Sequence, residues 1–318
     1  MGGRVRRSGR RRTARRERGD PGARRAAPGR TVARPPGTPR SRRRGGPIST
    51  EAASPHREPG APGGGFEVVT AANPSPYTLA GTNTYLIGRS GEAVVIDPGP
   101  EDPSHVAAVL DRAGAPGRRV ALILVSHGHS DHLGAADRLA HETGAPVRRW
   151  GAGTNPLRDE ELLPADGGGV RVLYTPGHAQ DHVVFYWIGP AVLFSGDLLL
   201  GTGTVQVTPP GGSMQDYLRS LERVAALALT LIAPGHGPVI RDPRARIAEY
   251  LAHRRERERQ IIEALAAGPR SAADLAEAIY AGLDPRLRRA AEGTVLAHLE
   301  KLVAEGRARR VGGRFAGA

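Results

Sequence analysis

The segment Ser126-His127-Gly128-His129-Ser130-Asp131-His132 follows directly after the apolar run 120–125. That run is continuously apolar, as expected for a strand buried on both faces. Two histidines alternate at the end of the strand, and Asp131 and His132 lie on the turn into a helical pattern. Four metal-ligand side chains within six residues are costly to desolvate together unless a cation lies among them. The segment therefore predicts a metal-binding loop at one edge of a sheet.

Three further ligand-type side chains follow strand-like runs in the same way. They are His178 after Thr175-Pro176-Gly177, Asp197 in Ser195-Gly196-Asp197, and His236 in Pro234-Gly235-His236-Gly237. The flanking glycines let the backbone turn sharply enough to aim each side chain inward. The chain contains no cysteine, so any metal must be held by nitrogen and oxygen ligands.

Short β-rich runs alternate with helical patterns around these residues. Strands are predicted at 66–70, 84–87, 93–96, 120–125, 170–174, 183–188, 191–194 and 231–233. The spacing of apolar residues predicts helices at 102–113, 133–143 and 213–227. Such a mixture indicates sheets covered by helices on their outer faces, so the expected fold class is α/β (α+β).

The strands stop near Arg244. Helices are predicted at 246–267, 271–280 and 285–305, and a β-hairpin at 307–311 and 314–316 around Gly312-Gly313. Three helices followed by a small hairpin are the outline of a winged helix. The predicted organisation is a tail at 1–65, a domain at 66–243 that contains all the ligand candidates, and a winged-helix-like domain at 244–318.

The net charge of +13 is unevenly distributed over the 318 residues. Residues 1–65 hold 18 arginines against 4 acids, residues 66–243 hold 12 basic against 18 acidic residues, and residues 244–318 hold 15 against 10. Positive surfaces attract phosphate backbones, and here that attraction belongs to the two ends. The segment 1–65 is rich in Arg, Pro and Gly and is predicted to be disordered. A transit peptide or translated upstream sequence are the alternatives for it.

No 18-residue apolar run or secretory signal pattern occurs in the sequence. Neither a membrane span nor a signal peptide is therefore expected. The abundance of Arg and Ala with almost no Lys favours a high-GC bacterial source and a cytoplasmic setting. The oligomeric state is left open.

The ligand candidates together resemble the metallo-β-lactamase superfamily. Its His-x-His-x-Asp-His signature is followed by His, Asp and His in this order, and every motif block is present here over 66–243. The resemblance implies a four-layer αββα sandwich that binds two divalent metal ions, expected to be Zn²⁺. It further implies that one ion is held by His127, His129 and His178, and the other by Asp131, His132 and His236, with Asp197 bridging the two.

Two zinc ions about 3.5 Å apart can share a water, lower its pKa and leave a bridging hydroxide to attack carbon or phosphorus. Asp131 is predicted to orient this nucleophile and then to deliver a proton to the leaving group. No Gly-x-Ser-x-Gly elbow is present, and cysteine is absent, so no side-chain nucleophile is expected. The chemistry predicts a hydrolase of an ester, thioester, lactam or phosphodiester.

Other polar residues carry weaker signals. Asp97, in Ile96-Asp97-Pro98-Gly99, resembles a position that orients the metal-binding loop, and the alternative is a turn aspartate. His182 either supports a metal ligand or simply packs in the core. Thr202 and Thr204 could line the cleft. The remaining histidines are expected on the surface: His56, His105, His141, His253 and His298.

The substrate follows less directly. The stretches 86–88, 175–186, 203–210, 284–287 and 294–299 resemble the β-lactamase-like protein 2 family, whose members join this catalytic domain to a winged-helix-like tail. Its animal members are single-stranded-RNA endoribonucleases, whereas fungal relatives are thioesterases that release polyketides. Fold analogy does not choose between these substrates.

Three functional hypotheses follow. The first is a single-stranded-RNA endoribonuclease, with nucleic-acid contacts predicted at Arg286, Arg288, Arg289, Arg307, Arg309 and Arg310. The second is a thioesterase or glyoxalase-II-like acyl hydrolase acting on a small ester or thioester. The third is a nucleic-acid-binding protein with a purely structural metal site. The third is disfavoured, because structural zinc sites are usually closed and cysteine-rich.

Overall fold

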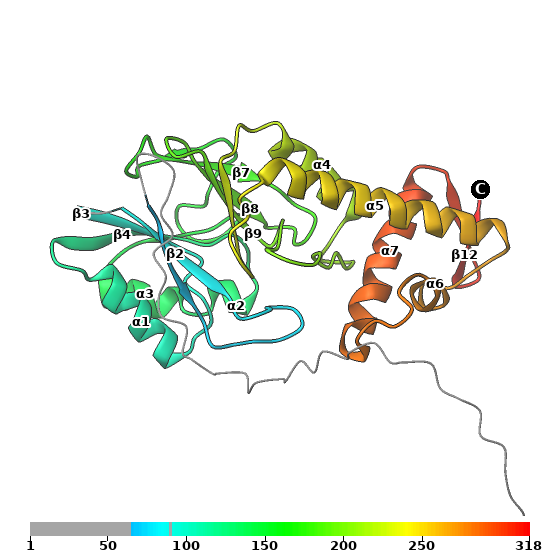
Figure 1. Ribbon diagram of the computed structural model, residues 1–318, viewed down its shortest axis with the longest axis horizontal. Coiled ribbons are helices and arrows are strands. Elements are labelled where there is room, and N and C mark those ends of the chain that lie inside the picture. The colour runs from blue at the N-terminus through cyan, green and yellow to red at the C-terminus, as the bar shows by residue number, and fades with distance from the viewer. Residues whose placement is uncertain (1–64, 89–90) are drawn as a thin grey trace, which may run out of the picture. The chain divides into compact units, whose positions relative to one another are not determined.

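The computed structural model describes residues 65–88 and 91–318. Of the segment 1–65, for which disorder is predicted, only Gly65 belongs to the described residues. The surface position predicted for His56 also lies outside them. The described residues form two five-stranded sheets with flanking helices, followed by a small C-terminal unit of helices and a hairpin (Figure 1).

The first sheet contains the N-terminal strands in sequence order. They are β1 (Glu67–Thr70), β2 (Asn83–Ile87), β3 (Gly91–Ile96), β4 (Arg118–Leu124) and β5 (Val147–Arg148). The first three strands pair antiparallel, and β3, β4 and β5 pair parallel. Helices α1 (Pro103–Ala113) and α3 (Ala136–Thr143) lie on one side of this sheet (Figure 1).

The second sheet has the order β10-β9-β8-β7-β6. Its strands are β6 (Leu162–Leu163), β7 (Val170–Tyr174), β8 (Val183–Trp187), β9 (Val192–Gly196) and β10 (Leu231–Pro234). Only β10 and β9 run parallel within it. Helix α4 (Met214–Ala225) and the first half of α5 (Pro243–Ala266) pack on its outer face.

Side-chain alternation along the strands divides the domain built on the two five-stranded sheets into layers. Val94 and Ile96 of β3 join Phe185 of β8 in a core between the two sheets. The alternate residue Val95 packs with Val106 of α1 on the opposite face of β3. Because successive strand residues point to opposite faces, both sheets are buried on both sides. The layer order is helix, sheet, sheet, helix, which confirms the predicted αββα sandwich.

The helix predicted at 133–143 is interrupted, and in this respect the prediction was wrong. A short helix α2 (Ser130–Leu133) ends before Gly134, and α3 begins at Ala136. The N–H of Ala135 donates to the carbonyl oxygen of Gly99 at 2.9 Å, and the N–H of Gly99 donates to the carbonyl of His132 at 3.2 Å. The chain after β3 thus docks at the break between the helices, a tertiary contact that local periodicity does not encode.

The C-terminal unit confirms the winged-helix prediction. It contains α6 (Ala272–Ile279), the 3₁₀ turn Pro285–Leu287, α7 (Arg288–Ala304), β11 (Ala308–Val311) and β12 (Arg314–Gly317). Ser271 and Asp274 form a reciprocal capping box at the start of α6, which satisfies two backbone donors of that helix.

Helix α5 takes part in two cores. Ile247 and Tyr250 pack with the residues on the outer face of the second sheet, whereas Ile261 and Leu265 pack with α6, α7 and the hairpin. One continuous helix therefore joins the two-sheet domain and the C-terminal unit. Within the described residues, no helix is both long enough and apolar enough to cross a membrane.

Candidate metal centre

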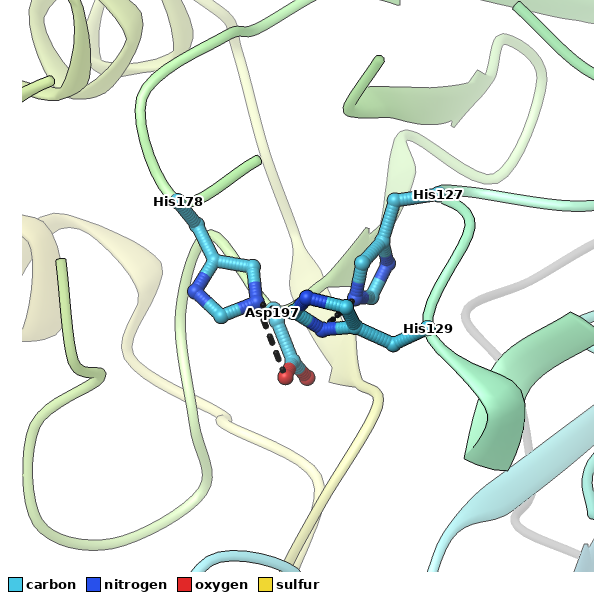
Figure 2. A group of neighbouring side chains, drawn as sticks. All are labelled: His127, His129, His178 and Asp197. Carbon is cyan, nitrogen blue, oxygen red and sulfur yellow. Dashed lines mark hydrogen bonds and ion pairs between the residues drawn. The ribbon is translucent and has the colours of Figure 1, made fainter. Parts of the chain in front are cut away.

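Three imidazoles and one carboxylate converge at the edge of the two sheets (Figure 2). His127 and His129 come from the loop after β4, His178 from the loop after β7, and Asp197 from the end of β9. His129 Nδ1 lies 2.8 Å from His127 Nε2 and 3.2 Å from His178 Nε2. His178 Nε2 lies 3.5 Å from Asp197 Oδ2. One ligand-type atom from each residue lies within 4.8 Å of the others.

A second group contains Asp131, His132 and His236. His132 Nε2 and His236 Nε2 are 3.3 Å apart, and Asp131 Oδ2 lies 3.3 Å from His236 Nε2. His236 follows β10, while the other two residues belong to α2. Strands and loops more than 100 residues apart in the chain therefore supply this group.

Asp197 contacts both groups with different oxygens. Its Oδ2 faces His178, while its Oδ1 lies 3.4 Å from His132 Nε2 and 3.3 Å from His236 Nε2. Among the described residues, Oδ1 is buried without a hydrogen-bond partner. A carboxylate divided in this way lies where a ligand bridging two cations would lie.

The donor set and its spacing fit divalent cations. Ligand atoms around a tetrahedral ion with bonds of about 2.0–2.1 Å, as in zinc sites, are separated by about 3.3–3.4 Å. The 3.2 Å from His129 to His178 and the 3.3–3.5 Å contacts of Asp197 are close to that value. A cation would also satisfy the orphaned Oδ1 of Asp197. The residues present therefore fit a metal at each group.

The outer nitrogen of His132 is held by Asp97. His132 Nδ1–H donates to Asp97 Oδ2 at 2.9 Å, which turns Nε2 toward the second group. Asp97 Oδ1 accepts from the backbone N–H of Ser126 at 2.7 Å, and Oδ2 also accepts from the Ser126 hydroxyl at 2.9 Å. Asp97 has φ of +52°, so its backbone is strained, and it is 2% exposed. These contacts tie the β3 end to the histidine loop.

His182 accepts a hydrogen bond from the backbone of Asp197. The backbone N–H of Asp197 donates to His182 Nε2 at 3.1 Å, and His182 Nδ1–H donates to the hydroxyl of Thr175 at 3.0 Å. Burial lowers the pKa of His182 to about 3, so the ring is neutral and can accept this bond. Gly196, with φ of +46°, is required here, because a Cβ would lie 2.9 Å from His182 Nε2 and 2.7 Å from Ser126 Oγ.

The rings of His127 and His178 are oriented by hydrogen bonds away from the centre. His178 Nδ1–H donates to the carbonyl oxygen of Gln206 at 2.9 Å. His127 Nδ1–H donates to Ser126 Oγ at 3.0 Å, since that hydroxyl gives its own proton to Asp97. Both rings therefore present Nε2 inward as a lone-pair donor.

The carboxylates around His132 and His236 stabilise positive charge in the second group. Burial opposes the charged form of His132, but the carboxylates of Asp197 and Asp97 overcome this and raise its pKa well above the ordinary value. Burial likewise opposes the charged form of His236, yet Asp197 and Asp131 raise its pKa to about 9. Protonation of His132 and His236 supplies the positive charge that a metal ion would otherwise supply. A metal ion that binds these rings releases the protons from the nitrogens that it binds.

A cavity of about 580 Å³ opens onto both groups. His129, Asp131, His178, Asp197 and His236 form part of its wall. The rest of the wall comes from the loop 75–79, the stretch 200–206 with Thr202 and Thr204 as predicted, Arg254 of α5, and the C-terminal unit from Tyr280 to Thr294. The C-terminal unit is thus part of the candidate active-site cavity.

Two hydrogen bonds attach the C-terminal unit to this wall. The backbone N–H of Val207 donates to Thr294 Oγ1 at 3.3 Å, and the Tyr77 hydroxyl donates to the carbonyl oxygen of Arg286 at 3.0 Å. Gly293 lies against Thr208, whose Oγ1 would be 2.6 Å from a Cβ at that position. Close approach of α7 to the stretch after β9 therefore depends on a small residue in the helix.

Several contacts at the centre were not predicted. Thr82 Oγ1 donates to Asp131 Oδ2 at 3.2 Å, and Asn83 Nδ2 donates to the carbonyl oxygens of Pro234 and Gly237 at 3.1 and 2.9 Å. Nothing in the local sequence Gly81-Thr82-Asn83-Thr84 shows that β2 lies beside the His236 loop. Thr82 and Asn83 are both buried.

The expectation of surface positions was wrong for two histidines. His105 is buried, and its Nε2 lies 2.9 Å from Thr84 Oγ1. His298 is fully buried in α7, with Nδ1 3.9 Å from Glu258 Oε2. Both lie on the inner face of their helices, where side-chain packing overrides the usual preference of histidine for partial exposure. His141 is exposed and His253 is half-buried.

The six arginines predicted to contact nucleic acid do not form one free basic surface. Arg286 pairs with Asp284 at 2.7 Å, Arg307 with Glu258 at 2.7 Å, and Arg310 with Glu300 at 3.2 Å. Arg288, Arg289 and Arg309 are exposed, and within the described part of the chain they form no ion pair. Half of the predicted positive charge is therefore already balanced by neighbouring carboxylates.

Comparison with known proteins places this geometry in a family. The family model described as the metallo-beta-lactamase superfamily matches residues 77–161 and 149–236, and the beta-lactamase-associated winged helix domain matches residues 271–316. The chain belongs to the metallo-β-lactamase superfamily. The resemblance found in the sequence is thereby confirmed, together with the winged-helix attachment.

The names of the similar proteins differ, and one of them states an activity. The beta-lactamase-like protein 2 homolog of Drosophila melanogaster is 34% identical over 263 residues, covering 76% of this chain and 88% of the relative. An atrochrysone carboxyl ACP thioesterase of Aspergillus chevalieri is 34% identical over 202 residues, covering 62% and 64%. The crystal structure of a metallo-beta-lactamase family protein of Thermus thermophilus has a TM-score of 0.68 at 28% identity, covering 80% of this chain and 98% of that one.

Proposed function

We propose that this superfamily member is a binuclear zinc hydrolase that cleaves an ester or thioester of a small acyl group. The observation that carries the proposal is the cavity of about 580 Å³, which opens onto both ligand groups and has a largely uncharged wall opposite them. Two zinc ions held by the seven ligand candidates would lower the pKa of a shared water and supply hydroxide near neutral pH.

The chain's own residues divide the remaining work. His127, His129 and His178 would hold one ion, Asp131, His132 and His236 the other, and Asp197 both. Asp131 is the candidate acid and base, because its carboxylate lines the cavity and its side chain remains 26% exposed. Burial favours the protonated form of Asp131, but the hydrogen bond from His236 and the charges of His132 and His236 lower its pKa to about 2. Asp131 is therefore ionised at neutral pH, as a carboxylate that binds a metal ion must be.

The cavity wall favours an acyl substrate over a phosphodiester chain. Leu200 and Val205 line it from the catalytic domain, and Leu283, Leu287 and Ala291 line it from the C-terminal unit. A phosphate backbone is normally met by several arginines or lysines. Of the residues that line this cavity, only Arg254 carries a permanent positive charge. The named thioesterase among the relatives supports the same direction.

Single-stranded-RNA cleavage is the second candidate, and one observation favours it. Arg288, Arg289 and Arg309 are exposed without ion pairs in the described residues, so they could follow a phosphate backbone outside the cavity. Binding through these residues would weaken steeply as salt is raised.

One experiment separates the candidates. Protein loaded with Zn²⁺ is assayed for thiol release from short acyl thioesters and for cleavage of single-stranded RNA, before and after dialysis against a chelator. The proposal predicts thioester turnover that chelation abolishes and added Zn²⁺ restores, with two zinc ions per chain by elemental analysis. RNA cleavage without thioester turnover would replace the acyl proposal with the second candidate. Inactivity in both assays with a full complement of metal would reject both.

A further inference from the structure

A buried positive charge lines the candidate active-site cavity. Arg254 lies in the middle of α5, it is 1% exposed, and it forms part of the wall that also contains His178 and Asp197. Arginine is almost never fully buried unless a carboxylate or another strong acceptor neutralises it. The position of this guanidinium therefore calls for an explanation.

The protein supplies only part of what this guanidinium needs. One terminal nitrogen, Nη2, donates to the carbonyl oxygen of Val205, and the group lies over the ring of Tyr217 at 5.2 Å. Within the described part of the chain, Arg254 forms no ion pair, and its buried Nε has no hydrogen-bond partner. A guanidinium has five N–H donors in a planar fork, and at least the buried Nε–H of Arg254 has no acceptor in the described residues.

Arg254 is also close to the metal centre through the chain. Val205 accepts from Arg254, and the next residue, Gln206, accepts from Nδ1 of the ligand candidate His178 at 2.9 Å. Consecutive residues lie about 3.8 Å apart, so the guanidinium lies on the order of 10 Å from the His178 ring. A molecule of a few carbon atoms spans that separation.

From these observations we propose that Arg254 binds an oxyanion group of the substrate, a carboxylate carried by the acyl chain. The cleavable bond would lie at the metal centre, and the far end of the acyl chain would be anchored by the guanidinium. The planar fork of arginine matches the two oxygens of a carboxylate, and burial strengthens such a bond. This inference rests on the proposed function, because it specifies the class of acyl group that the same cavity accepts.

Matched substrates test the inference. Thioesters of succinic, glutaric and adipic acid are compared with their terminal amides, which have nearly the same shape but no charge, after subtraction of the uncatalysed rate. Wild-type protein should prefer the acid over the amide by about 10- to 100-fold in kcat/KM for at least one chain length. Equal turnover of acid and amide at every length would overturn the proposal while leaving the hydrolase function intact. A phosphonate-terminated chain that is preferred over the carboxylate would assign the oxyanion as phosphate-like.

Substitutions locate the preference. Arg254→Met should bring the acid-to-amide ratio of kcat/KM close to one, whereas Arg255→Met, at an exposed neighbouring position, should leave that ratio as in the wild type. An equal loss on both substrates would show that Arg254 is only structural and would overturn the proposal. Should Arg254→Met fail to fold, Arg254→Lys, which keeps the positive charge, is assayed in its place. The preference of the wild-type protein for the acid over the amide still tests the proposal.

If neither the acid-terminated nor the amide-terminated thioesters are cleaved, the proposed function fails, and binding at Arg254 is tested separately. Glutarate is added to chelator-treated wild-type protein and Arg254→Met, and the melting temperatures are measured. A rise confined to the wild type supports an oxyanion site at Arg254. No rise in either protein overturns it.

Discussion

The candidate metal centre and the surface of the C-terminal unit differ in how far neighbouring groups compensate their charges. At the centre, Asp197 is buried with an oxygen that has no hydrogen-bond partner among the described residues, and two neighbouring histidines have pKa values raised by carboxylates. At the C-terminal surface, Glu258 contacts Lys301 and Arg307, each at 2.7 Å. Incomplete charge compensation in a buried site indicates that a ligand completes it, whereas a balanced surface cluster needs none.

The largest expected effect comes from removing the candidate acid and base while leaving its shape. Asp131→Asn should lower kcat by about 10²- to 10⁴-fold, because the amide cannot accept and return a proton. Thiol release from an acyl thioester measures the rate, and elemental analysis of the same sample measures bound zinc. Asp137→Asn, at an exposed position in the same part of the chain, is the matched control. Activity within threefold of wild type would remove Asp131 from the chemistry.

A smaller effect is expected one contact away from the ligands. Asp97→Asn loses the carboxylate that accepts from His132 Nδ1, so the ring is no longer held in the orientation that presents Nε2. Zinc affinity should fall by about 10- to 100-fold, measured by competition with a chromophoric chelator. Asp111→Asn, an exposed residue of α1, should leave it unchanged. Undiminished affinity in Asp97→Asn would show that Asp97 only shapes the turn.

The smallest effect is predicted at the balanced cluster and concerns stability rather than activity. Lys301 and Arg307, each 2.7 Å from its carboxylate, lower the pKa of Glu258 to about 2, although burial opposes this. Because the folded-state pKa lies below the unfolded value, Glu258 stabilises the fold above about pH 4.5, and the contribution disappears as the pH falls toward 2.

Glu258→Gln should therefore lower the free energy of unfolding by about 1–2 kcal/mol at pH 7, allowing for solvent screening, and by roughly half as much or less near pH 3. Urea unfolding at both pH values measures the difference. Glu263→Gln, which removes an exposed pair with Arg259 on the same helix, should cost less than about 0.5 kcal/mol. A pH-independent difference would mean that shape, not charge, decides the role of Glu258.

Local patterns made much of the fold predictable. The apolar run that became β4 was recognisable because a strand buried on both faces has no polar alternation, and α6 was recognisable from Ser271 at its cap. The two-residue strands β5 and β6 were not predicted, because pairs such as Val147–Arg148 are too short to carry a period. The break at Gly134 was missed because its cause is a hydrogen bond from Ala135 to the distant Gly99.

The sequence by itself determined the ligand candidates and the order in which they occur, because imidazole and carboxylate groups crowded after strands have few stable alternatives to holding a cation. Only the tertiary structure decided how Asp197 divides its oxygens between the two groups and how Asp97 and His182 contact them. It also decided that Arg254, from a helix shared by two cores, lines the same cavity. Burial and distance between remote segments arise from packing, and no local pattern of residues encodes them.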